Sequence, residues 1–155
     1  MTINLDVQIV SKNSDIPGDV DFQCWADVVP AAEKTSACVR IVDEPEAKKL
    51  NKEYRHIDKA TNVLSFPAEL PTEIELQFLG DIVICAPVVD REAQQQGKQP
   101  SDHWAHLLVH GLLHLQGYDH QEDSEADEME SLEIEILQKL NIPNPYKPIP
   151  MIKAH

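Results

Sequence analysis

The chain has 155 residues, of which 42% are hydrophobic, and carries a net charge of −14. This length predicts one domain over residues 1–155 with a sizeable core, and the acidic charge argues against a protein that coats nucleic acid without selectivity. No apolar run approaches the roughly 20 residues that span a bilayer, and the N-terminus lacks a signal-peptide pattern. The three cysteines are odd in number and widely separated, which predicts reduced thiols and a cytoplasmic location without a membrane partner.

Hydrophobic periodicity and turn residues predict strands and helices in mixed order. In the first half we expect a strand over 3–10, a short helix over 22–29, a strand over 37–42, a helix from Glu44 and a strand over 61–66 ended by Pro67. A loop over 68–77 should lead to a strand over 78–85 and a helix from Pro87 to Gly97. A helix capped by Ser101 or Asp102 and a last helix over 122–140 should follow, before an irregular Pro-rich tail from about residue 141. The pattern indicates an α+β fold in which a small mixed four-stranded sheet packs on helices.

Two of these helices have distinct surfaces. The helix from Glu44 is expected to bury Ala47, Leu50 and Tyr54. The helix that begins near residue 101 is apolar nearly all round, which predicts the central, buried helix of the fold.

Basic residues are concentrated in one short stretch. Lys48, Lys52, Arg55 and Lys59 follow the spacing i, i+4, i+7, i+11, so they would share one face if the stretch were helical. Such a row is typical of a solvated helix face, which is the favoured interpretation of these residues taken alone.

Three histidines follow the spacing H-x3-H-x5-H at His110, His114 and His120. Residues four apart lie on the same side of a helix, so His110 and His114 could hold one ion. Gly117 can adopt the positive φ that ends a helix, which would bring His120 back over that ion. Three imidazoles leave one coordination position open, as in a catalytic zinc site.

The spacing equals that of the metzincin metallopeptidases, H-E-x-x-H-x-x-G-x-x-H, with one difference. Gly111 stands where those enzymes have the glutamate that acts as general base. The sequence therefore predicts their metal geometry without their base.

Taken together, the motifs closely resemble the YbeY family of bacterial endoribonucleases over essentially the whole chain. The segments that carry the resemblance are Tyr54-Arg55, Thr61-Asn62-Val63-Leu64-Ser65-Phe66-Pro67, Leu79-Gly80-Asp81-Ile82-Val83-Ile84 and the histidine motif.

The resemblance implies a zincin-like fold and a single-strand-specific, zinc-dependent endoribonuclease with one ion per chain. It implies processing of ribosomal RNA, including the 3′ end of 16S rRNA, and a role in ribosome quality control. His110, His114 and His120 fall on the family's ligand positions, with His110 also catalytic, and Arg55 falls on an arginine used for RNA binding and catalysis. Lys59 is expected to help to bind the substrate. A small-subunit ribosomal protein and an assembly GTPase are implied as partners, and DNA is not.

The chain departs from the family pattern after Arg55. His56 and Ile57 stand where a glycine and a lysine are usual, and Ala60 replaces a proline before Thr61. These changes affect the expected conformation of the loop around Arg55 and leave the metal ligands intact.

Several assignments stay open at this level. Asp81 and Asp119 are candidates for the proton acceptor or for orienting an imidazole. His103 and His106 lie near the helical face of His110 and could bind a second metal or serve as polar neighbours. Imidazole ligands suit zinc, nickel, copper and iron alike. A metallopeptidase and a non-catalytic ribosome-assembly factor with a structural metal are the rival functions.

Overall fold

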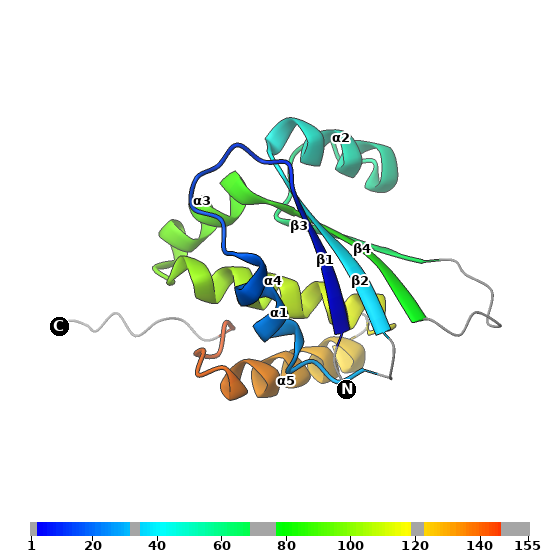
Figure 1. Cartoon of the computed structure of the whole chain (residues 1–155), viewed down its shortest axis with the longest axis vertical. Coiled ribbons are helices and arrows are strands. Elements are labelled where there is room, and N and C mark those ends of the chain that lie inside the picture. The colour runs from blue at the N-terminus through cyan, green and yellow to red at the C-terminus, as the bar shows by residue number, and fades with distance from the viewer. Residues whose placement is uncertain (1–2, 32–34, 69–76, 119–122, 147–155) are drawn as a thin grey trace.

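The structure is a computed structural model that describes residues 3–31, 35–68, 77–118 and 123–146 (Figure 1). The elements in chain order are β1 (Ile3–Ile9), α1 (Asp19–Ala26), β2 (Thr35–Val42), α2 (Glu44–Arg55), β3 (Val63–Pro67), β4 (Gln77–Cys85), α3 (Ala86–Gln96), α4 (Pro100–Leu115) and α5 (Asp123–Lys139). The predicted α+β fold with a four-stranded mixed sheet is confirmed. Residues 69–76 of the expected loop and most of the tail lie outside the described residues, and Gln77, which was expected to end the loop, is the first residue of β4.

The sheet has the strand order β1-β2-β4-β3. β1, β2 and β4 are parallel, and β3 runs antiparallel to β4 at one edge. Pro67 was expected to stop β3 but is its last residue, which an edge strand tolerates because a proline there withholds no ladder hydrogen bond. Opposite it, Gly80 has a φ of 139°, and a Cβ atom there would lie 2.2 Å from the carbonyl oxygen of Phe66.

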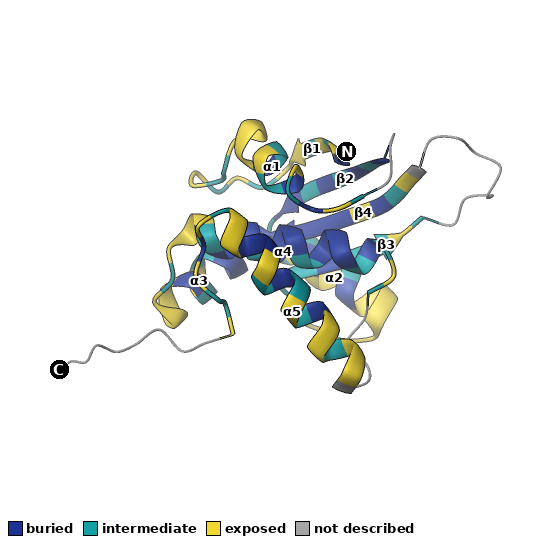
Figure 2. Ribbon diagram, turned by 90° about the horizontal axis from the view of Figure 1, so that it is seen from below, coloured by how far each residue is buried: buried dark blue, intermediate teal, exposed yellow. Residues whose placement is uncertain are grey.

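Helices cover both faces of the sheet (Figure 1). α1, α4 and α5 lie on one side, and α2 lies on the other. The alternation of side chains along β4 follows from this arrangement: Ile82 and Ile84 join the core beneath α4, whereas Val83 and Cys85 join a smaller cluster with Ala47 of α2. Figure 2 shows that α4 is dark with buried residues along most of its length, as the sequence predicted for a central helix.

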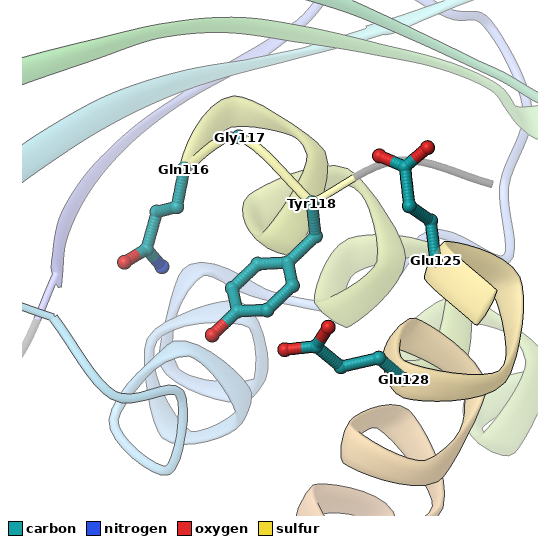
Figure 3. Close-up of a pocket in the computed structure, with 5 residues that line it drawn as sticks. All are labelled: Gln116, Gly117, Tyr118, Glu125 and Glu128. Atoms are coloured by element: carbon teal, nitrogen blue, oxygen red, sulfur yellow. The ribbon is translucent and has the colours of Figure 1, made fainter. Parts of the chain in front are cut away.

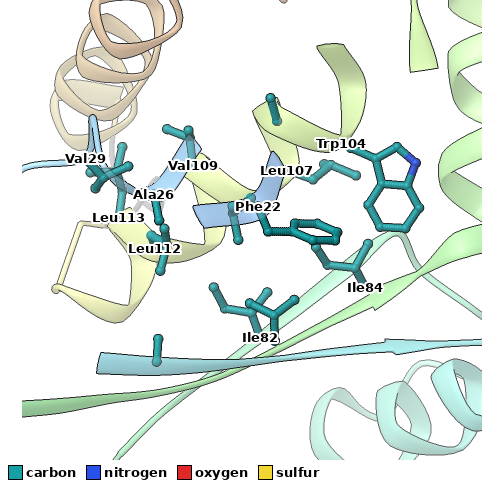
Figure 4. Packing of buried hydrophobic residues seen from close by; sticks show 14 of the residues in the cluster. Phe22, Ala26, Val29, Ile82, Ile84, Trp104, Leu107, Val109, Leu112 and Leu113 are labelled. Carbon is teal, nitrogen blue, oxygen red and sulfur yellow. The ribbon is translucent and has the colours of Figure 1, made fainter. Parts of the chain in front are cut away.

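The larger core is centred on α1 and α4 (Figure 4). Phe22 meets Trp104 edge to face, with ring centroids 5.8 Å apart and planes at 78°. Both side chains are almost completely buried, and burial of an aromatic ring of this size contributes about 2 kcal/mol or more. This packing fixes the position of α4, the helix that carries the histidine motif.

Two helix boundaries and one side-chain exposure differ from the expectations. α4 begins at Pro100 with Gln99 as its N-cap, rather than at Ser101 or Asp102, because a proline suits the first helical position. α2 ends at Arg55, so Lys59 does not extend its basic face. Tyr54 is 62% exposed rather than buried.

The buried polar residue of α2 is Asn51. Its Nδ2 donates a hydrogen bond of 2.8 Å to the carbonyl oxygen of Lys59, which ties the loop after α2 back onto the helix. Within the described part of the chain, no helix is long and apolar enough to cross a membrane.

Candidate metal centre

Two imidazoles lie next to each other on the second half of α4. The ring centroids of His110 and His114 are 4.6 Å apart and the ring planes are at 80°. The i, i+4 spacing produces this proximity, as expected from the sequence. Both residues are only partly buried, so the pair is reachable from solvent.

The chain reverses directly after this pair. Gly117 has a φ of 103°, the left-handed backbone conformation that the sequence predicted for it. Its amide donates to the carbonyl of His114 at 3.0 Å, and the amide of Tyr118 donates to the carbonyl of Leu113 at 3.1 Å. These two bonds form a Schellman motif, which satisfies the last carbonyls of α4. His120 and Asp119 lie outside the described residues, so their roles stay predictions.

Gly111 faces the sheet. A Cβ atom built at Gly111 would lie 3.0 Å from Cδ1 and 3.1 Å from Cγ2 of Ile82. A glutamate at this position would therefore meet the side chain of a buried strand residue. A side chain at this position would therefore require Ile82 to shift, because α4 packs closely on β4.

A buried carboxylate that the sequence analysis did not identify lies beneath the histidines. Oε1 of Glu133 on α5 is 2.8 Å from Nε2 of His106, 3.2 Å from Nδ1 of His110 and 2.9 Å from the hydroxyl of Tyr146. The Glu133 side chain is only 1% exposed. Its position could have been noticed, because Glu133 stands one turn after Met129 in the apolar stripe of α5, where a charged residue is unusual.

The contacts of this carboxylate determine its charge. Burial alone would raise the pKa of Glu133, but the hydrogen bonds from His106 and His110 outweigh it and lower that pKa to about 2. Burial lowers the pKa of His106, and burial together with the neighbouring carboxylate raises the pKa of Tyr146. At neutral pH, Glu133 is an anion that only accepts hydrogen bonds, so both imidazoles and the phenol act as donors to it.

Three of these groups could hold a metal ion. One ligand atom each from His106, His110 and Glu133 lies within 4.8 Å of the others. His103 has a different partner, since its Nε2 lies 2.9 Å from Oε1 of Glu92. The sequence left open whether His103 and His106 bind a second metal or serve as polar neighbours. In the structure, His103 contacts a carboxylate of α3, and His106 belongs to the cluster around Glu133.

Two pockets adjoin this region. One of about 350 Å³ is lined by His110, Glu133, Tyr146 and residues of α5. The other, of about 380 Å³, lies where α4 ends and α5 begins (Figure 3). Its lining includes Tyr118 and the acidic side chains of Glu125 and Glu128, so a polyanion would be repelled from it.

The predicted substrate-binding residues lie elsewhere on the fold. Arg55 is the last residue of α2, on the side of the sheet opposite α4, and Lys59 lies in the loop that follows; both are exposed. Within the described residues, neither forms a salt bridge. Asp81 is exposed on β4 next to the thiol of Cys38, and the neighbouring Ile82 packs toward α4, so the Asp81 side chain points to the opposite face.

The residue after Arg55 has the backbone conformation of a glycine. His56 has φ 60° and ψ 29°, and its amide bonds to the carbonyl of Lys52 at 3.1 Å. A left-handed residue at this position commonly ends a helix. The helix end before the 57–62 loop is therefore formed despite the substitution that the sequence analysis noted.

Known proteins are similar to this chain over most of its length. Residues 21–141 match the protein family described as endoribonuclease YbeY. The endoribonuclease YbeY of Alteromonas mediterranea is 52% identical over 154 residues, which cover 94% of this chain and 98% of that protein. A solution structure of a protein from Thermotoga maritima covers 92% of this chain and 99% of its own, with 22% identity and a TM-score of 0.46. The family match and the 52% identity show that the chain belongs to the endoribonuclease YbeY family.

Proposed function

We propose that this protein is a metal-dependent endoribonuclease that cleaves single-stranded RNA during ribosomal RNA maturation. The observation that carries the proposal is the pair of imidazoles of His110 and His114, 4.6 Å apart on a solvent-reachable part of α4. Membership of the endoribonuclease YbeY family supports RNA as the substrate class.

The donor set suits a divalent transition metal such as zinc. Two imidazoles one helical turn apart offer nitrogen ligands, and Gly117 turns the chain so that His120 is a candidate third ligand. A bound ion would supply Lewis-acid charge beside a phosphoryl group and would lower the pKa of water. His110 and His114 would hold it. Glu133 already accepts hydrogen bonds from His106, His110 and Tyr146, and Gly111 carries no side chain that could act as a base.

Arg55 is proposed to bind the RNA backbone. Its guanidinium could hold a phosphate through two parallel hydrogen bonds, and Lys52 and Lys59 add positive charge nearby. Because β3 is the edge strand between the α2 face and the α4 face, an RNA strand that crosses this edge could contact both Arg55 and the histidines.

The packing of Gly111 favours this function over a metallopeptidase. A peptidase of the metzincin type needs a glutamate at this position, where this chain has a glycine whose added Cβ would press on Ile82. A ribosomal assembly GTPase and a small-subunit ribosomal protein are proposed as partners. Phosphate binding by an acidic protein depends on a local basic surface, so this protein alone should bind RNA weakly and rely on partners to position it.

Cleavage of a single-stranded 16S rRNA 3′ fragment by the zinc-loaded protein tests the proposal. The control is His114→Ala protein purified in the same way. Cleavage by the parent and none by the variant is the expected result. Equal cleavage by both would refute metal-dependent catalysis at this pair, and turnover of casein with no RNA cleavage would support the peptidase.

A further inference from the structure

Glu133 joins three elements at a single oxygen atom. The donors to its Oε1 are His106 and His110 from α4 and Tyr146 from the segment that follows α5. Such a buried anion is costly unless donors surround it, so the arrangement stabilises one particular placement of each donor.

The contact with His110 determines which ring nitrogen can bind a metal. A neutral imidazole carries one proton, and an ionised carboxylate can only accept a hydrogen bond. Nδ1 of His110 faces Oε1 of Glu133 at 3.2 Å, so in a neutral His110 this contact favours the tautomer with the proton on Nδ1 and the lone pair on Nε2. A carboxylate that holds the distant nitrogen of a metal-ligating histidine fixes both the ring orientation and the tautomer.

The same geometry argues against Glu133 as a ligand of the catalytic ion. Its side chain is 1% exposed, compared with 21% for His110, so an ion bound at the carboxylate would have no position open to a polymer such as RNA. An ion there, in addition to one held with His114, would also require both ring nitrogens of His110 to bind metal. The ring would then have to lose its second proton.

We infer that Glu133 is a positioning residue, which accepts a hydrogen bond from Nδ1 of His110 and thereby leaves Nε2 of His110 as the nitrogen that would bind the metal. This inference rests on the proposed metal site at His110 and His114. It adds a structural consequence: Tyr146 shares the same oxygen, so the segment after α5 is linked to the metal centre through one carboxylate.

Zinc affinity of the full-length protein, measured by competition with a chromophoric chelator, tests this role. Glu133→Gln keeps the shape of the side chain but removes its charge, and we expect zinc to bind about 10- to 100-fold more weakly. The matched control is Glu135→Gln, the same change at an exposed position of α5, which should bind within about twofold of the parent. Equal affinity of the Glu133→Gln protein and the parent would overturn the inference.

Long-range ¹H–¹⁵N NMR of the zinc-loaded parent protein gives a second measurement that does not depend on whether a variant folds. The expected spectrum has a proton on Nδ1 of His110 and the metal-induced shift on Nε2. Metal bound through Nδ1, or a second zinc ion that His106→Ala removes, would overturn the inference. A protein that binds zinc through Nε2 of His110 yet cleaves no RNA would refute the proposed function and leave the role of Glu133 intact.

Discussion

Gly111 of α4 packs against Ile82 of β4 so closely that a Cβ atom would lie 3.0 Å from the isoleucine Cδ1. The contact places the helix with the histidine motif directly on the sheet. The glycine also distinguishes this chain from the metzincin peptidases, which have a glutamate as general base at the same position of the motif.

We predict that Gly111→Glu destabilises the protein by more than about 2 kcal/mol, because it forces a carboxylate against a buried isoleucine. Urea unfolding of the metal-free protein measures this change. Ser101→Glu, at an exposed position in the first turn of the same helix, is the control and should leave stability nearly unchanged. A stable Gly111→Glu protein with casein-hydrolysing activity would contradict both the packing argument and the exclusion of a peptidase.

His56→Gly should stabilise the protein. A non-glycine residue in the left-handed region is strained by roughly 1–2 kcal/mol, and part of that gain is lost to the greater freedom of glycine in the unfolded chain, so about 0.5–1 kcal/mol should remain. Thermal unfolding checks the sign. Glu53→Gly, inside α2 and exposed, should instead lose about 1 kcal/mol. If both variants were destabilised equally, His56 would not be strained.

Arg55→Ala is expected to lower RNA cleavage by about 100-fold, since a guanidinium that stabilises developing phosphoryl charge contributes on this scale. Zinc affinity and the free energy of unfolding should not change, because Arg55 is exposed at the end of α2. Arg91→Ala removes the same charge from an exposed position of α3 and serves as the control. Full cleavage by the Arg55→Ala protein would remove Arg55 from the proposed site.

Glu92 makes stability depend on pH. Burial alone would raise its pKa, but hydrogen bonds from His103 and Asn62 lower it below the usual value. A depressed pKa in the folded state contributes stability that is fully present above the unfolded pKa of about 4.3 and is lost as the pH falls through the folded value. The parent should therefore exceed Glu92→Gln in unfolding free energy at pH 7 by more than at pH 3. A difference that is independent of pH would contradict this account.

Local patterns in the sequence were sufficient to predict much of the fold. The i, i+4 histidines and the positive φ of Gly117 depend on a single turn of helix and its end, and both are confirmed in the described residues. The α+β fold with one small four-stranded sheet was also predicted, from apolar patterns, β-branched runs and turn residues along the chain, and it is confirmed.

Other features depend on contacts between distant segments, which spacing does not reveal. Glu133 meets His110 across 23 residues of sequence, and only the docking of α5 against α4 brings them together. Tyr54 fits an apolar helical stripe, yet it is exposed and makes its aromatic contact with Phe66, at 5.0 Å between ring centroids. The proposed ligand His120 lies outside the described residues, so its role depends on the motif alone.

The central claim is that His110 and His114 hold the metal that cleaves RNA. Its most direct test is cleavage of a single-stranded ribosomal RNA fragment by zinc-loaded parent protein and by a His110→Ala, His114→Ala variant, with zinc content measured in both. We predict one zinc ion and cleavage for the parent, and neither for the folded variant. A variant that has lost its zinc and still cleaves the RNA at the parent's rate would contradict the account.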